Sequence, residues 1–186
     1  MAFRIVIGDV TIGIQGQDFS YIFSVGSGGM ESLYKDGKEW LYRSPRPAFW
    51  RATTDNDRGN GFVFRSAVWS AADRFVRCVK VTARMDEQEI SMPPAPENNK
   101  YNGDETCDRF EISYTYETPT VPVTEVTVSY LVESDGRIHV QVDYLGKRGL
   151  PELPVLGLRF LMPTAAEGYT YEGLSGETYP DRMAGG

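Results

Sequence analysis

One short polar segment of the chain, residues 49–61, combines aromatic, cationic and carboxylate side chains that could contact a sugar. Aromatic rings stack on the apolar faces of sugars, while guanidinium and carboxylate groups hydrogen-bond sugar hydroxyls. The same residue types could instead form an arginine–aspartate network that fixes a loop crossing from one sheet to the next. Buried polar clusters more often satisfy structural hydrogen bonds than bind ligands, which favours the network. Both interpretations apply to the same candidates, which are Trp50, Arg51, Asp55, Asn56 and Asp57.

Residues that commonly bind metal ions are too few or wrongly spaced for a metal site. The Asp-Asn-Asp run of this segment lacks the alternating ligands, central glycine and distal glutamate of an EF-hand loop. Cys78 and Cys107 have no CxxC spacing, and His139 is the single histidine. We therefore expect no metal and no cofactor in this chain.

No motif for enzyme catalysis is recognisable in the sequence. It has no nucleophile elbow, no Walker loop and no dinucleotide-binding fingerprint. Aspartates and glutamates are scattered, so spacing alone selects no carboxylate pair for glycoside hydrolysis. His139 shares a strand face with Gln141 and Asp143, which favours a solvated histidine over a general base. We assign no catalytic residue.

The composition limits the class of protein. The chain has 186 residues, is 41% hydrophobic and carries a net charge of −7. This apolar fraction is too high for a disordered chain, and the acidic balance argues against nucleic-acid or anionic-membrane partners. No apolar run approaches the roughly 20 residues that span a bilayer, and no secretory signal is visible at the start. We expect a cytoplasmic protein.

The segments that would position the polar residues are mostly strands. Apolar and polar residues alternate with a period of two along much of the chain, as in antiparallel strands with one buried face. Asp36-Gly37 and Asp135-Gly136 each separate two such segments and are typical of two-residue hairpin turns. Further strands are expected at 3–10, 19–25, 75–84, 109–118, 155–162 and 169–172. The sequence thus predicts an all-β protein built as a large antiparallel sandwich.

Three regions depart from this strand pattern. Apolar residues at near-helical spacing predict one short helix near 62–74. Prolines, asparagines and glycine over 89–106 predict a long surface loop inside the same domain. The chain ends on a polar loop with no closing strand. We therefore expect a single domain, 1–186, that is truncated at its C-terminal end.

Three motifs occur in an order typical of one enzyme family. The first is the hairpin from Gly29 to Leu41, and the second is Phe-Trp-Arg-Ala followed by Asp-Asn-Asp and Gly59. The third is Tyr-Pro-Asp-Arg at 179–182. Together they resemble the C-terminal, small-chain-type domain (domain 5) of family 2 glycoside hydrolases, the β-galactosidases. The resemblance covers nearly all of the chain and adds Tyr179, Asp181 and Arg182 to the candidate substrate-binding residues.

The resemblance implies a fold and an indirect function. The fold would be an antiparallel β-supersandwich, galactose mutarotase-like, of which this chain is the N-terminal part. It would dock on a catalytic barrel domain or large chain that carries both catalytic glutamates of a retaining mechanism. This chain would then be a non-catalytic domain, inactive alone, that helps to shape the pocket for terminal β-D-galactosides and packs on the barrel. Any Mg or Na of the enzyme would be bound by other domains, and the oligomeric assembly is left open.

Two alternatives belong to other functional classes. A stand-alone carbohydrate-binding module would use Trp50, Arg51, Asp55 and Asp57 as its sugar site. A mutarotase would need an acid and a base across the sugar ring oxygen, and His139 matches that requirement poorly. The mutarotase hypothesis follows from fold analogy alone, and a fold does not determine function.

Overall fold

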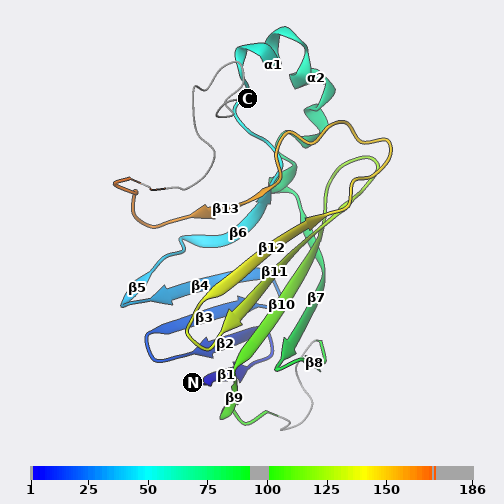
Figure 1. Cartoon of the computed structure of the whole chain (residues 1–186). Coiled ribbons are helices and arrows are strands. Elements are labelled where there is room, and N and C mark those ends of the chain that lie inside the picture. The colour runs from blue at the N-terminus through cyan, green and yellow to red at the C-terminus, as the bar shows by residue number, and fades with distance from the viewer. Residues whose placement is uncertain (1, 93–100, 169, 171–186) are drawn as a thin grey trace, which may run out of the picture.

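Antiparallel strands pair into three sheets in the computed structural model, which describes residues 2–92, 101–168 and 170. The six-stranded sheet runs in the order β5 (Lys38–Glu39), β4 (Gly29–Lys35), β3 (Phe19–Ser24), β2 (Thr11–Gln15), β1 (Phe3–Ile7), β9 (Glu105–Cys107). The five-stranded sheet runs in the order β12 (Ile138–Tyr144), β11 (Glu125–Glu133), β10 (Arg109–Glu117), β7 (Arg77–Met85), β8 (Gln88–Ile90). A two-stranded sheet joins β13 (Gly157–Leu161) to β6 (Arg43–Ala48). The two larger sheets pack as a sandwich, and the helical segments lie at the end of the molecule away from the N-terminus (Figure 1). The predicted all-β antiparallel sandwich is confirmed.

Both large sheets bury one face against the other. On β10 and β11 every second residue is buried, as the alternation of the sequence predicts. Phe23 of the six-stranded sheet contacts Phe110 and Tyr130 of the five-stranded sheet, with ring centroids 5.8 and 5.6 Å apart. Tyr114 donates a hydrogen bond from its buried hydroxyl to the carbonyl of Gly29, across the sandwich. Aromatic rings therefore form the centre of the core, where each one buries a large apolar area.

The two predicted hairpin turns are present. Asp36 and Gly37 have φ angles of 54° and 77°, the left-handed pair that a type I′ turn requires. In the second turn Gly136 has a φ of 78°, and a Cβ at this position would lie 2.5 Å from Cδ1 of Phe19. Glycine is therefore needed at 136 both for its backbone conformation and for space.

The region near 62–74 is helical as predicted, but it folds into separate short turns and not into one continuous helix. They are α1 (Asp55–Gly59), α2 (Phe62–Arg65) and two 3₁₀ turns, η1 (Ala67–Trp69) and η2 (Ala72–Arg74). Gly61 before α2 and Ala71 before η2 have φ angles of 74° and 64°, which interrupt the helical backbone. None of the helices in the described ranges is long and apolar enough to cross a membrane.

Long-range contacts hold these short turns in place. Trp69 is fully buried, and its indole Nε1 donates to the carbonyl of Pro151 at 3.1 Å. Its ring also contacts Phe49 and Tyr144, with centroids 5.6 and 6.0 Å away. The Ser66 hydroxyl donates to the carbonyl of Glu152, also at 3.1 Å. Tertiary packing thus determines the path of this region in place of helix propensity.

Four strands, β2, β6, β8 and β9, were not predicted. β6 contains Pro45 and Pro47, and two prolines argue against a strand when only the sequence is considered. Because β6 pairs only with β13, it is an edge strand, where proline is tolerated. β8 and β9 occupy the two ends of the loop predicted over 89–106. The described residues exclude 93–100, so the length of the loop predicted over 89–106 stays a prediction. They also exclude the end of the chain and most of the strand predicted at 169–172, so the truncation stays a prediction as well.

Candidate functional site

The predicted polar segment connects β6 to α2, and an ion pair lies at its centre. Arg51 donates from Nη1 to Oδ2 of Asp57 at 2.6 Å and from Nη2 to Oδ1 at 3.1 Å. Two parallel hydrogen bonds of this kind fix the planes of both groups. The ion pair therefore connects the residues that follow β6 to the first turn of α1.

Asp57 also caps the helix in which it lies. Its Oδ2 accepts from the backbone N–H of Thr54 at 2.8 Å, while the Thr54 hydroxyl accepts from the backbone N–H of Asp57 at 3.2 Å. This reciprocal arrangement is a capping box, with aspartate in the place of the usual glutamate. Because α1 has only five residues, its cap is a large part of what keeps it folded.

The electrostatics of the pair suit a permanent carboxylate. The hydrogen bonds from Arg51, followed by that from the Thr54 backbone, hold the pKa of Asp57 well below its ordinary value. Asp57 in turn raises the pKa of Arg51. Asp57 thus stays ionised at neutral pH, and its two oxygens already accept three hydrogen bonds. Such a group braces the segment and is unsuited to act as an acid catalyst.

Phe62 belongs to this segment although the sequence analysis assigned it only to a helix. Its buried ring stacks on Trp50, with centroids 6.3 Å apart and planes 19° from parallel. The guanidinium carbon of Arg51 lies 5.4 Å from the centre of the same ring, within the range of a cation–π contact. Trp50 is half-buried and Arg51 keeps 40% of its side chain exposed. Sequence analysis missed Phe62 as a member of this cluster because its contacts with Trp50 and Arg51 arise only when the chain folds back.

Of the other candidates, two are exposed on α1 and three lie outside the described residues. Asp55 is almost fully exposed and forms an ion pair with Arg58, one turn along α1. Asn56 is also exposed. Structure therefore brings together Trp50, Arg51 and Asp57 of the predicted set. The remaining three candidates, which lie outside the described residues, are Tyr179, Asp181 and Arg182.

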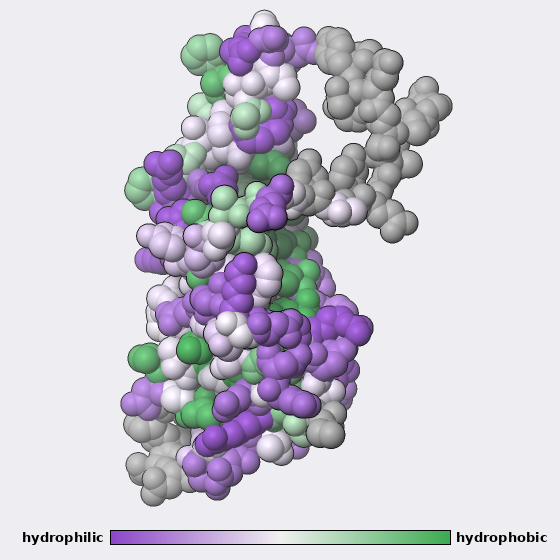
Figure 2. All heavy atoms as spheres, turned by 90° about the vertical axis from the view of Figure 1, so that its left-hand side faces the viewer, coloured by the Kyte–Doolittle hydropathy of each residue, from purple (hydrophilic) through white to green (hydrophobic). Residues whose placement is uncertain are grey.

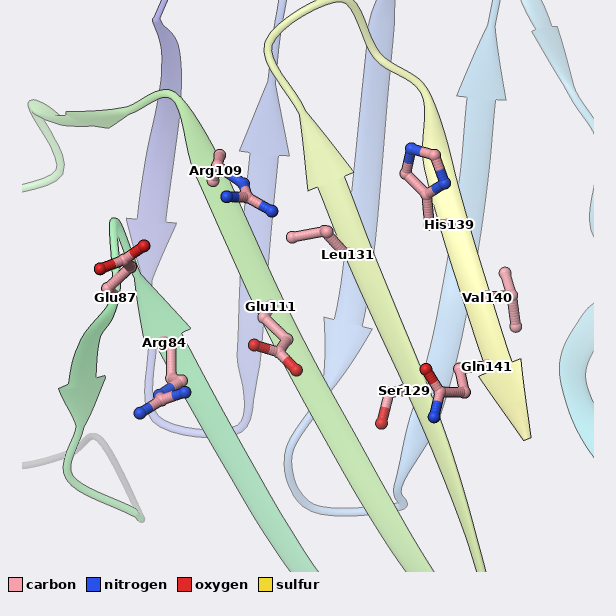
Figure 3. A pocket seen from close by; sticks show the side chains of 9 residues that line it. All are labelled: Arg84, Glu87, Arg109, Glu111, Ser129, Leu131, His139, Val140 and Gln141. Atoms are coloured by element: carbon pink, nitrogen blue, oxygen red, sulfur yellow. The ribbon is translucent and has the colours of Figure 1, made fainter. Parts of the chain in front are cut away.

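A hollow of about 500 Å³ lies on the outer face of the five-stranded sheet (Figure 3). Arg84, Glu111 and His139 project into it from three different strands, and among the described residues no phenylalanine, tyrosine or tryptophan lines it to stack on a sugar. The Nε2 atom of His139 lies 3.1 Å from Oε2 of Glu133, and the histidine is exposed on the edge strand β12, as predicted. Over the described ranges, no group of three His, Cys, Asp or Glu side chains could hold a metal ion.

A second hollow, of about 770 Å³, lies beside the two-stranded sheet and has a different character. Four arginines and one aspartate line it, contributed by β6, β13 and the turn η2. The aspartate, Asp73, accepts a hydrogen bond from Arg159 at 2.7 Å. The hollow is therefore cationic in an acidic protein. Its lining residues are Arg43, Ser44, Arg46, Asp73, Arg74, Val76, Arg159 and Leu161.

The fold and the polar segment at 49–61 define a β-sandwich domain. In the part of the chain that the structure describes, no set of side chains is arranged for catalysis. Comparison with known families then identifies it. The sequence model described as "Beta galactosidase small chain" matches residues 15–186, and the chain belongs to this family. The resemblance inferred from the three motifs is confirmed.

Relatives of two kinds match the chain. It is 58% identical over 182 residues to the "Beta-galactosidase small subunit" of Latilactobacillus sakei, covering 98% of this chain and 57% of the relative. It is 39% identical over 183 residues to a "Beta-galactosidase" of Clostridium acetobutylicum and 32% identical to one of Streptococcus thermophilus. In these two it covers 18% and 16% of the relative. The chain thus spans little more than half of the small subunit and less than a fifth of the longer relatives.

Proposed function

We propose that this chain is the non-catalytic, small-subunit-type domain of a β-galactosidase. In that enzyme it helps to shape the galactoside-binding pocket and packs on the catalytic subunit during hydrolysis of terminal β-D-galactosides. The observation that carries the proposal is the family match over residues 15–186. The name of the Latilactobacillus sakei relative implies a large-subunit partner, and we extend that partnership to this chain.

The braced segment supports a role in forming the wall of a pocket. A wall that positions a substrate has to keep its shape when water is excluded, and this requires side chains already fixed by their neighbours. The two hydrogen bonds between Arg51 and Asp57 and the stacking of Trp50 on Phe62 supply such fixation. Trp50 remains half-buried, so part of this aromatic surface is available to a ligand or to the partner.

A reconstitution experiment tests the proposal. The purified chain should not cleave a chromogenic galactoside, while adding it to the large subunit that accompanies the Latilactobacillus sakei protein should give a complex and increase its activity. Size-exclusion chromatography measures association, and release of the chromophore measures activity. Cleavage by the chain alone, or neither association nor a gain in activity, contradicts the proposal.

A stand-alone carbohydrate-binding module is the second candidate, favoured by the half-buried Trp50 beside Arg51. Titration of the chain with galactose or lactose in an isothermal titration calorimeter separates the two functions, because this signal does not depend on Trp50 as a fluorescent reporter. Saturable millimolar binding that Trp50→Ala abolishes supports the module. The matched control is Trp40→Ala, because Trp40 is exposed on the distant hairpin next to Lys38.

A further inference from the structure

The cationic hollow beside the two-stranded sheet contains an arrangement that the fold itself does not explain. Arg46 of β6 and Arg159 of β13 are directly opposite each other in the antiparallel register. Like charges at such positions repel and destabilise the pair of strands. Arg43 and Arg74 add two further positive charges to the same hollow. The chain thus concentrates positive charge here despite its net charge of −7.

Only one of these arginines is neutralised within the described residues. Arg159 binds Asp73, whose side chain is 11% exposed, at 2.7 Å. Arg43, Arg46 and Arg74 have no acidic partner within ion-pair distance among the residues that the structure describes, and all three are exposed. Three unpaired guanidinium groups around one hollow can each bind a carboxylate through two hydrogen bonds.

We infer that this arginine hollow is a docking surface for an acidic segment of the catalytic subunit. The inference rests on the proposed function and names the chemistry of its interface. A peptide segment fits better than a small anion, because the arginines come from three separate elements around an open hollow of about 770 Å³. Figure 2 views the molecule from the side on which β6 and β13 lie, and hydrophilic residues (purple) cover much of that surface. A charged contact suits such a surface better than an apolar one.

Two triple variants of the full 186-residue chain test the inference. Arg43→Gln/Arg46→Gln/Arg74→Gln removes the unpaired charges of the hollow, and Arg84→Gln/Arg109→Gln/Arg137→Gln removes three exposed arginines on or beside the five-stranded sheet. Both variants change the net charge equally. Binding to the immobilised large subunit at about 50 mM salt should weaken at least tenfold for the first and less than about twofold for the second, and the difference should shrink at about 0.5 M salt.

Controls for folding and chemistry accompany this measurement. Arg46→Gln alone should melt at or above the temperature of the parent chain, because it removes the repulsion with Arg159. A fluorescein-labelled decaglutamate peptide at low salt should bind the parent and the control variant but not the hollow variant. Equal binding of both triple variants to the large subunit overturns the inference and leaves the proposed function intact.

The proposed function can also fail while the chemistry of the hollow is still tested. If the parent chain does not bind the large subunit, the proposed function fails. The decaglutamate peptide then decides the chemistry of the hollow by itself. Loss of its binding in the hollow variant supports an acidic ligand from another source, whereas unchanged binding overturns the inference.

Discussion

Asp57 is the residue on which the local geometry of the polar segment depends. It accepts two hydrogen bonds from Arg51 and one from the Thr54 backbone, so it ties together three positions of one short segment. Its carboxylate also lies in the first turn of α1, where negative charge interacts favourably with the helix dipole. Asp55 lies in the same turn but is exposed, and its ion pair with Arg58 is solvated. Two aspartates that are equivalent in sequence therefore differ in what they stabilise.

Replacing Asp57 with asparagine should lower the melting temperature at neutral pH and weaken the pH dependence of stability. The pKa of Asp57 is lower in the folded chain than its ordinary value of 3.8, so folding favours the ionised form. That stabilisation is fully present above about pH 5 and is lost as the pH falls below 3.8. Thermal melts between pH 7 and pH 2 should show a smaller loss for the variant than for the parent.

The matched control for this change is Asp55→Asn, which alters the same charge at a solvated position. It should melt close to the parent chain at every pH. Equal effects of the two substitutions would mean that the hydrogen bonds of Asp57 contribute no more than a surface ion pair.

Two buried tyrosines allow a direct test of hydrogen bonding in the core. Tyr114 donates to the carbonyl of Gly29, whereas the Tyr130 hydroxyl has no hydrogen-bond partner in the part of the chain that the structure describes. Tyr114→Phe should cost about 1 kcal/mol of the free energy of unfolding, and Tyr130→Phe should be neutral or stabilise by about 1 kcal/mol. Urea denaturation measures both, and a larger loss for Tyr130→Phe would show that its hydroxyl has a partner in solution.

At the scale of elements, turns and edges are where sequence and structure differ most. The hairpins around Asp36-Gly37 and Asp135-Gly136 were predictable because turn chemistry is local. The short turns at 62–74 were not, because their geometry depends on Trp69 binding a carbonyl 82 residues away. The strand β6 was hidden by its two prolines, which only its edge position permits.

The candidate site was predictable to a similar extent. An arginine–aspartate network in this segment was one of two interpretations of the sequence, and the structure contains such a pair in Arg51 and Asp57. Which aspartate pairs, and that Phe62 completes the cluster, depends on how α1 turns the chain back. Long-range contacts of this kind leave no periodic signal in a single sequence.

Two turn glycines separate backbone strain from crowding. Gly37 and Gly136 both have φ angles near +77°, so alanine at either position costs about 1 kcal/mol in backbone strain. A Cβ at Gly37 would meet nothing within 4 Å, but at Gly136 it would collide with the ring of Phe19. Gly136→Ala should therefore destabilise by roughly 1–3 kcal/mol more than Gly37→Ala. Urea denaturation of both variants checks this, and equal losses would mean that Phe19 moves aside freely.

At the scale of the whole molecule, the sandwich buries the thiol of Cys107 and partly covers that of Cys78. Burial, followed by the charges of Asp86 and Asp108, raises the pKa of Cys107 to about 12, and burial also raises the pKa of Cys78. Cys107 is buried on β9, where it pairs with Phe3 of β1. Its reaction with a disulfide reagent therefore requires the edge of the six-stranded sheet to open.

In a Cys78→Ser variant, Cys107 should react with Ellman's reagent at pH 8 at least about 100-fold more slowly than in denaturant. Added guanidinium should increase the rate in parallel with the loss of native circular dichroism. A native rate within about tenfold of the denatured rate would mean that β9 opens independently of the sandwich.

Trp69 links regions that are far apart in the chain, and this matters for protein engineering. It contacts Phe49 at the start of the polar segment, Tyr144 at the end of β12 and the carbonyl of Pro151. A transplant of residues 49–61 into another sandwich would leave behind the indole and the carbonyl that anchor them. Chimaeras between members of the family should exchange the stretch from β6 to η2 together with residues 144–152, so that these contacts are transferred as one unit.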